Sequence, residues 1–286
     1  MRKILITGSG TLIGGEIVKF LAKKGFRIIG IYNKSVPKTK HKKVTFIRKN
    51  LAKKLNIKTK FDYIIHCASK IPSDGNTKRV MSTNITMLKN LLNIDHKKDL
   101  KKIIFLSTMS VYCQITKKII NEKTLPKNLD PYGKSKLDCE KYIKNKLYKK
   151  ISYTILRLPG VVGKKSKHNF MSNLVKNIKE NKRVKITNAN SYFNNIVHVE
   201  TISNLILHSI NYDKTNNIYN VSSSKPVKLK DCVKILFRLF RKKVNLEEIR
   251  SNNKSFMIST KKIKIRHYPI ISTKQSLKKF YESNKK

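Results

Sequence analysis

The first half of the chain alternates short apolar runs with stretches of helical periodicity, and this alternation limits the folds that it can adopt. The apolar runs predict strands at residues 3–7, 26–32, 44–47, 61–66, 102–107 and 151–156. The helical stretches predict helices at residues 14–24, 77–92 and 131–149. Strands that alternate with helices form βαβ units, whose right-handed crossovers build a parallel sheet. We therefore expect an α/β protein with a doubly wound parallel sheet.

The second half follows a looser rhythm. It predicts helices at residues 170–180, 199–210, 229–241 and 276–281, and a short strand at residues 218–221. We expect residues 1–163 to form the main domain and residues 164–286 a small lobe, some segments of which return to the sheet. Because ligands of open α/β sheets bind at the carboxyl ends of the strands, the lobe is expected to cover that edge.

The chain is strongly basic, with 65 Lys and Arg against 16 Asp and Glu and a net charge of +49. A surface of this kind attracts polyanions such as nucleic acid. The lysines are spread along the whole chain, however, and a dedicated tail would gather them into blocks. The abundance of Lys, Asn and Ile also matches what AT-rich codons encode. We favour compositional drift for most of the excess and keep nucleic-acid binding as the alternative.

Several protein classes are disfavoured. No apolar run reaches the roughly 18 residues of a membrane helix. The first predicted strand begins at Lys3, which leaves no room for a signal peptide, so we expect a cytoplasmic protein without a membrane span. The four cysteines, at positions 67, 113, 139 and 232, form no CxxC pair, and neither a metal site nor a disulfide framework is expected.

A glycine-rich turn, TGSGTLIG at residues 7–14, follows the first predicted strand and opens the first helix. Glycines let the backbone approach a pyrophosphate, and the helix N-terminus directs N–H groups and a positive dipole at the phosphates. The second strand ends in Asn33 and Lys34, without the acid that binds the ribose 2′-hydroxyl of NAD and repels a 2′-phosphate. The turn therefore predicts a dinucleotide site, and the neutral strand end favours NADP over NAD.

Tyr132 and Lys136 lie four residues apart on a predicted helix, which places both side chains on one face. A phenol with a pKa near 10 is a poor base at neutral pH. A nearby ammonium group stabilises the phenolate and lowers its pKa. The spacing therefore suits acid–base chemistry.

Three segments together resemble the extended short-chain dehydrogenase/reductases, the NAD(P)-dependent epimerase/dehydratase family. ITGSGTLIG resembles the family's TGxxGxxG turn, with Thr11 in place of the middle glycine. FLSTMSVY resembles its SSxxVYG or STDEVYG segment, and PYGKSKLDCE its PYgxSKxxxE block. The resemblance implies a Rossmann enzyme that binds NADP or NAD in residues 1–163 and a nucleotide-activated sugar in a small C-terminal substrate-binding lobe. Tyr132 would be the acid–base residue, Lys136 its electrostatic partner, and Thr108 the donor that orients the reacting oxygen.

Weaker matches extend the resemblance over nearly the whole chain. DYIIHCAS at residues 62–69 resembles DxViHxAa, and RLPGVVG at residues 157–163 resembles RxxNxxG. Met109 and Ser110 replace the Asp-Glu pair that sugar dehydratases use, so we expect an epimerase or a reductase and not a dehydratase. The alternative is a non-catalytic nucleic-acid-binding or regulatory member of the same fold. Family dimers often pack through the helix at residues 131–149, so a homodimer is expected only where the lysines of that segment splay to the rim of the interface.

The resemblance also implies a set of site residues. Those expected at the cofactor are Gly8, Ser9, Gly10, Thr11, Leu12, Ile13, Gly14, Asn33, Lys34, Asn50, Leu51, Cys67, Ala68, Ser69, Asn84, Tyr132, Lys136 and Pro159. At the substrate the resemblance implies Thr108. We also expect His168 and Asn169 there because they follow the variable loop, and His198 either there or in a structural role at the junction with the lobe.

Overall fold

The computed structural model describes residues 2–57, 59–71, 77–94, 99–147, 151–164, 166–167, 169–251 and 254–285. The elements in chain order are β1 (Lys3–Thr7), α1 (Leu12–Lys23), β2 (Arg27–Tyr32), β3 (Val44–Arg48), β4 (Tyr63–His66), α2 (Thr77–Leu92), β5 (Lys102–Thr108), the 3-10 helix η2 (Met109–Val111), β6 (Ile119–Ile120), α3 (Pro131–Leu147), β7 (Ser152–Leu158), β8 (Gly160–Val162), α4 (Phe170–Lys179), β9 (Val184–Ile186), β10 (Tyr192–Phe193), β11 (Ile196–His198), α5 (Val199–Asn211), β12 (Asn217–Asn220), β13 (Val227–Lys228), α6 (Leu229–Leu239), β14 (Leu246–Glu248), β15 (Met257–Ile258), α7 (Lys261–Ile265) and α8 (Thr273–Asn284).

The chain divides into two compact units that are interleaved in sequence. The first unit comprises residues 1–114, 125–157 and 203–219, and the second comprises residues 115–124, 158–202 and 220–286. The chain passes from the first unit to the longest part of the second between residues 157 and 158, close to the predicted domain boundary at residue 163. The assignment of cofactor and substrate binding to the two parts of the chain stays a prediction.

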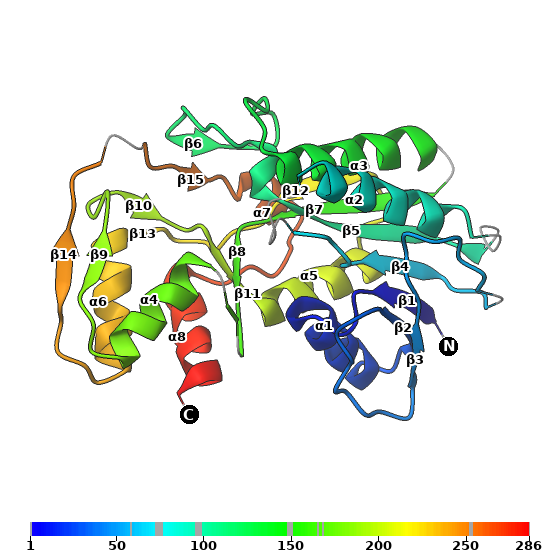
Figure 1. Cartoon of the computed structure of the whole chain (residues 1–286), viewed down its shortest axis with the longest axis horizontal. Helices are drawn as coiled ribbons and strands as arrows, with labels where there is room; N and C mark the ends of the chain where they lie inside the picture. Colours follow the sequence, from blue (N-terminus) through cyan, green and yellow to red (C-terminus); the bar gives the residue numbers. More distant parts are fainter. Residues whose placement is uncertain are drawn as a thin grey trace. The chain divides into compact units, whose positions relative to one another are not determined.

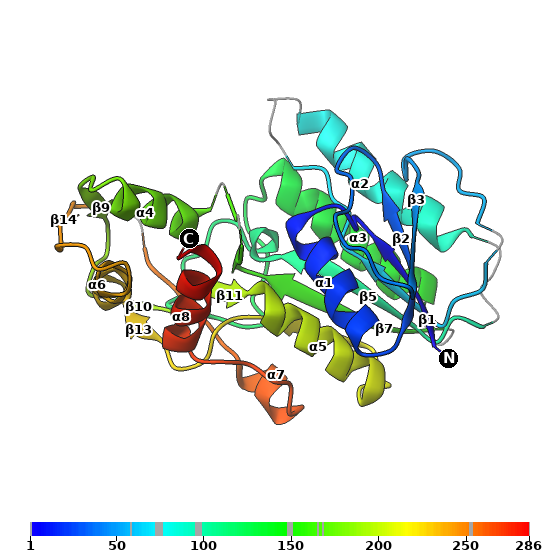
Figure 2. The ribbon, with the colours of Figure 1, turned by 90° about the horizontal axis from the view of Figure 1, so that it is seen from below.

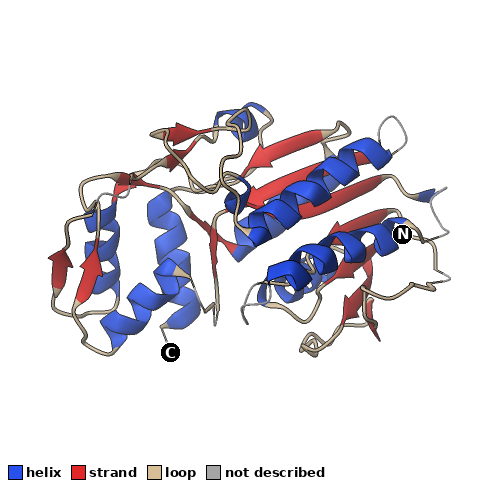
Figure 3. Ribbon diagram, turned by 45° about the horizontal axis from the view of Figure 1, so that its top comes forward, coloured by secondary structure: helices blue, strands red, loops and turns tan. Residues whose placement is uncertain are grey.

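The first unit is built on a seven-stranded sheet in the order β12-β7-β5-β4-β1-β2-β3. β1 pairs in parallel with β2 and β4, β2 with β3, and β4 with β5. α2 and α3 lie on one face of this sheet and α1 and α5 on the other (Figures 1 and 2), and Figure 3 shows the strands framed by these helices. The expected α/β fold with a doubly wound parallel sheet is therefore confirmed.

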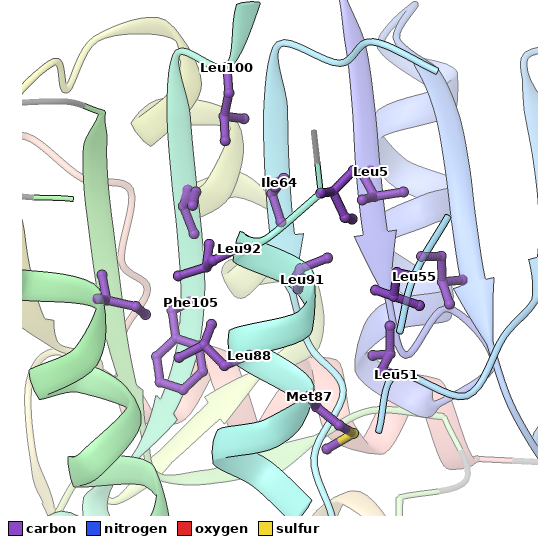
Figure 4. Packing of buried hydrophobic residues seen from close by; sticks show 14 of the residues in the cluster. Leu5, Leu51, Leu55, Ile64, Met87, Leu88, Leu91, Leu92, Leu100 and Phe105 are labelled. Carbon is purple, nitrogen blue, oxygen red and sulfur yellow. The ribbon is translucent and has the colours of Figure 1, made fainter. Parts of the chain in front are cut away.

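The core of this unit fills the space between the sheet and α2. Leu5, Ile64 and Phe105 come from neighbouring strands, and Leu88 and Leu91 come from the helix (Figure 4). All five are at most 2% exposed. Because burying one such side chain contributes about 1.5–3 kcal/mol, the apolar runs that predicted the strands also stabilise them.

The second unit has its own core. α6 packs against α4 and α8, and Ile178, Phe237 and Leu277 from these helices are buried together. Its strands have two or three residues each. Strands this short carry too little alternation to be predicted, which is why the sequence indicated only a loose rhythm here. Among the described residues of the whole chain, no helix is long and apolar enough to cross a membrane.

Capping residues explain where two helices begin earlier than predicted. Thr11 caps α1, because its hydroxyl accepts from the N–H of Gly14, and the helix starts at Leu12 instead of residue 14. A capping box between Ser272 and Gln275 starts α8 at Thr273, three residues before the predicted start.

A buried ion pair fastens the end of α5 to the start of β5. The Nζ of Lys102 lies 4.0 Å from Oδ1 of Asp213, and both side chains are nearly inaccessible to solvent. The same ammonium donates to the carbonyls of Ser209 and Asp213, and Asp213 also accepts from the hydroxyl of Tyr219 at 2.9 Å. Burial lowers the pKa of Lys102 to about 8, against the opposing effect of Asp213.

We expect Asp213→Asn to lower the free energy of unfolding by about 3 kcal/mol at pH 7, because the Lys102 ammonium would lose its counter-ion in a buried place. The loss should shrink at pH 9.5, since Lys102 is charged only below about pH 8. Urea unfolding at both pH values measures this. Asp99→Asn, in the exposed Lys60–Asp99 pair, serves as the control and should change little. An equal loss at both pH values would contradict the role of the charge.

Candidate active site

The glycine turn is held by close backbone contacts. Gly8 has a φ of +69°, and a Cβ at this position would lie 2.9 Å from the N of Ala68. A Cβ on Gly14 would lie 2.2 Å from the carbonyl oxygen of Gly8, and one on Gly10 would lie 1.6 Å from that of Ser35. The turn therefore needs glycine at all three positions, and the glycine at position 10 faces the loop that follows β2.

Thr11 replaces the glycine that the family usually has at this point of the turn. Its hydroxyl donates to the carbonyl of Gly8 at 2.8 Å and accepts from the N–H of Gly14 at 3.1 Å. The side chain is thereby turned back onto the helix start. The first N–H groups of α1, at Leu12 and Ile13, have no carbonyl one turn earlier within the helix, so they remain suited to an anion.

A pocket of about 490 Å³ opens beside this turn in the first unit. Nine of the predicted cofactor residues line it: Gly8, Gly10, Thr11, Asn33, Lys34, Asn50, Leu51, Ala68 and Ser69. The remaining lining residues are Ile31, Tyr32, Ser35, Lys49, Ala52, Lys70, Arg79, Thr83 and Met87. A pocket of this volume that begins at a glycine turn and a helix start suits a dinucleotide.

Four cations and no carboxylate are among the lining residues. Lys34 follows β2, Lys49 follows β3, Lys70 follows β4 and Arg79 comes from α2. Only Lys34 was predicted from the sequence. The other three carry no local signal, because basic residues are common throughout this chain. They come together only through the order of the strands and the placement of α2.

The start of α3 is fixed by its contact with η2. A Cβ on Gly133 would lie 2.1 Å from the carbonyl oxygen of Ser110, and the N–H of Gly133 donates to Oδ1 of Asp130 at 2.6 Å. Thr108 caps η2, where its hydroxyl accepts from the N–H of Ser110 and donates to the Ser110 hydroxyl, both at 3.2 Å. This contact brings the segments that carry Tyr132 and Thr108 together.

Tyr132 lies in a mostly buried position next to the pocket. Burial raises the pKa of its phenol, and a hydrogen bond with Ser69, a residue that lines the pocket, lowers it. Lys136, which was expected to lower this pKa, is not among the causes of the shift. The hydroxyl of Ser69 is the nearby group that stabilises the phenolate here.

Lys136 is buried one turn further along α3, with 3% of its surface exposed. Its Nζ lies over the ring of Phe105, 4.1 Å from the centroid. Burial lowers the pKa of this ammonium group to about 8, and Cys139, Glu140 and Cys67 act in the opposite direction.

Asn84 connects the segment after β4, at Lys70, with Ser135 of α3. Its Oδ1 accepts from the N–H of Lys70 at 2.8 Å, and its Nδ2 donates to the Lys70 carbonyl at 3.1 Å and to Oγ of Ser135 at 2.9 Å. Ser135 in turn donates to the carbonyl of Tyr132 at 2.8 Å. Asn84 therefore supports the site through hydrogen bonds from α2.

A buried ion pair, which sequence analysis did not identify, holds α3 to the sheet. Glu140 accepts from Nε and Nη2 of Arg157 at 3.0 and 2.6 Å, and from the hydroxyl of Ser107 at 2.6 Å. The Nη1 of Arg157 donates to the hydroxyl of Tyr112 at 2.6 Å. Burial lowers the pKa of Arg157, but its hydrogen bonds and charge interaction with Glu140 raise that pKa further, so the guanidinium keeps its charge.

The remaining predicted residues belong mostly to the second unit. Asn169 caps α4 and donates to the carbonyl of Val161 at 3.0 Å, and the buried His198 has its Nε2 3.2 Å from Oγ of Ser283. Pro159 also lies in this unit, between β7 and β8, and His168 lies outside the described residues. The substrate and cofactor roles of these four residues stay predictions.

Ser9 and Cys67, two further predicted cofactor residues, are not among the residues that line the pocket. Ser9 is fully buried, and a Cβ on Gly30 would lie 3.0 Å from its side chain. Burial raises the pKa of the Cys67 thiol to about 12, so it is protonated at neutral pH.

The sequence matches the model of the NAD dependent epimerase/dehydratase family over residues 4–222. A UDP-glucose 4-epimerase of pea (Pisum sativum) is 30% identical over 160 residues. That alignment covers 49% of this chain and 46% of the pea enzyme, so the chain spans about half the length of this relative.

Two solved structures share the fold over almost the whole chain. A UDP-glucose 4-epimerase from Thermotoga maritima, solved with UDP-glucose, has a TM-score of 0.82 at 21% identity. A UDP-glucuronic acid 4-epimerase from Bacillus cereus, solved in complex with NAD, has a TM-score of 0.81 at 21% identity. Each comparison covers 99% of both chains.

We expect Gly133→Ala to lower the free energy of unfolding by about 1–3 kcal/mol, because the added methyl group would collide with the backbone of Ser110 and force α3 away from η2. Urea unfolding measures the effect. Gly15→Ala in α1 is the matched control and should be tolerated, since its Cβ would come no closer than 3.4 Å to another atom. Equal stability of Gly133→Ala and the parent would show that the contact is dispensable.

Proposed function

The chain belongs to the NAD-dependent epimerase/dehydratase family, and on this basis we propose that it is an epimerase or reductase of a nucleotide-activated sugar. The observation that carries the proposal is the placement of Tyr132 and Lys136 on α3. Lys136 is buried, Tyr132 is partly buried, and Tyr132 is hydrogen-bonded to Ser69, which lines the pocket. The substrate class is supported by the pea and Thermotoga maritima relatives, which are described as acting on or solved with UDP-glucose.

The side chains of the site suit the transfer of a proton at the reacting oxygen. A nicotinamide dinucleotide bound in the pocket would supply the acceptor or donor of the hydride. In the direction of oxidation, the Tyr132 oxygen takes the proton of the sugar hydroxyl as the hydrogen on the same carbon leaves as hydride. Thr108 orients that hydroxyl, the Ser69 hydroxyl favours the phenolate of Tyr132, and Lys136, one turn further along α3, carries a positive charge into the same buried region. In the direction of reduction, the same proton returns from Tyr132.

The segment after β5 argues against dehydration. Loss of water from a sugar needs a second acid and a second base, and Met109 and Ser110 occupy the positions where sugar dehydratases have Asp and Glu. A thioether has no ionisable proton and the aliphatic hydroxyl of serine does not ionise near neutral pH, so neither replaces a carboxyl group as acid or base. The proposal is therefore restricted to reactions in which a single carbon is oxidised or reduced.

Epimerisation and reduction differ in the fate of the cofactor. An epimerase oxidises and then re-reduces the same carbon, so its cofactor is retained. A reductase delivers the hydride once and releases the oxidised cofactor. The cations around the pocket, Lys34 and Lys49 above all, support NADP and with it a reductase, whereas the pea relative supports an epimerase.

We expect Tyr132→Phe to reduce turnover of a nucleotide sugar by about 10²–10⁴-fold, because the ring without its hydroxyl cannot exchange the proton. The dissociation constant for the dinucleotide should stay within about threefold of the parent. Steady-state kinetics and fluorescence titration measure the two quantities. Tyr192→Phe, at an exposed residue of the second unit, is the control. Full activity of Tyr132→Phe would refute the mechanism.

We expect Lys34→Ala to weaken NADPH binding by about tenfold and to leave NADH binding nearly unchanged, because one charge-assisted hydrogen bond to a 2′-phosphate would be lost. Fluorescence titration with each dinucleotide at moderate salt measures this. Lys38→Ala removes an exposed charge four residues away that does not line the pocket, and it should change neither affinity. Tighter binding of NADH than of NADPH by the parent chain would overturn the preference for NADP.

A further inference from the structure

We propose that Phe105 is a positioning residue, whose ring face holds the ammonium group of Lys136 in place within the buried part of the site. This inference rests on the proposed function for its catalytic meaning, but the contact itself can be tested without turnover. No motif indicated it, because Phe105 belongs to an apolar strand run and is separated from Lys136 by 31 positions in the sequence.

The contact is built from two strands and a helix. Phe105 of β5 is 1% exposed, and Nζ of Lys136 from α3 lies 4.1 Å from the centre of its ring. His66 of β4 stands opposite Phe105 in the sheet register. Its ring stacks on that of Phe105 with centroids 5.7 Å apart and planes inclined by 18°. Figure 4 shows Phe105 beside Leu88 of α2, so the phenyl ring is also packed against the helix layer.

Among the described contacts, the ring of Phe105 is the group over which Nζ of Lys136 lies. Lys136 makes no hydrogen bond and no ion pair within the described part of the chain. The carboxylate of Glu140, one turn further along the same helix, is occupied by Arg157 and Ser107. A buried ammonium group without a counter-ion is costly. The negative face of an aromatic ring attracts a cation strongly when both are desolvated, and it does so without using the N–H donors. Those donors remain available for a ligand.

The other titratable groups around Lys136 do not replace the ring. The Nδ1 of His66 is paired with Oγ1 of Thr7 at 2.8 Å. Burial and then the charge of Lys136 lower the pKa of His66 to about 3, so the imidazole is neutral. Burial raises the pKa of Cys67 to about 12 and that of Cys139 to about 11, so both thiols are protonated. Glu140 acts on Lys136 through its charge, although it is bound to Arg157.

The decisive experiment replaces Phe105 with 4-fluoro-, 3,5-difluoro- and 3,4,5-trifluorophenylalanine by site-specific incorporation. Fluorine withdraws charge from the ring face and nearly preserves its shape. We expect the folding equilibrium constant at pH 7, from urea unfolding, to fall stepwise by a total of about three- to tenfold. In the Lys136→Met background the same series should show no stepwise fall. At pH 10 the fall should also vanish, because Lys136 is charged only below about pH 8.

The same fluorinated residues at Phe61, a buried core position that no cation covers among the described contacts, provide the matched control and should give flat series in both backgrounds. An equal fall at position 105 in the parent and in the Lys136→Met background, or a fall that persists at pH 10, would show that Phe105 is only a packing residue. A stepwise fall that depends on Lys136 supports the contact. If the parent chain then turns over no nucleotide sugar, the proposed function fails while the contact stands.

Discussion

The buried pair between Glu140 and Arg157 is the interaction on which the arrangement of the site depends. It joins the middle of α3 to β7, and through Ser107 and Tyr112 it reaches the end of β5. Two desolvated charges are tolerated only when their hydrogen bonds are nearly complete, and removing one partner of such a pair typically costs about 3–5 kcal/mol. The pair therefore sets the position of α3 on the sheet, and with it the positions of the residues one and two turns earlier on the same helix.

Burial shifts the pKa values of Tyr132 and Lys136, the two residues on those turns, in opposite directions. Burial raises the pKa of Tyr132 and lowers that of Lys136, so both side chains are driven toward their neutral forms. The surroundings then act on each of them separately. The hydroxyl of Ser69 favours the phenolate of Tyr132, and the ring of Phe105 favours the ammonium of Lys136. Opposite pKa shifts of this kind allow one residue to act as an acid and another as a base at the same pH.

The few glycines of this chain show where the backbone geometry allows no other residue. Only ten glycines occur, and those of the first turn and of α3 lie where a methyl group would collide with backbone atoms. Elsewhere left-handed conformations are adopted by other residues, among them Asn181, Arg241 and Cys113. Left-handed backbone is therefore not confined to glycine in this chain, whereas the close approach of backbone atoms in the first turn and at α3 leaves no room for a side chain.

The sequence by itself determined the order of strands and helices in the first unit, the glycine turn, and the spacing of Tyr132 and Lys136. Each of these features depends on residues close together in the sequence, where periodicity and local sterics decide the secondary structure. The short strands of the second unit, the cation set around the pocket, the Glu140–Arg157 pair and the contact of Lys136 with Phe105 were decided only by the tertiary structure. Each joins residues that are distant in sequence, and their meeting depends on how the elements pack, which no local pattern encodes.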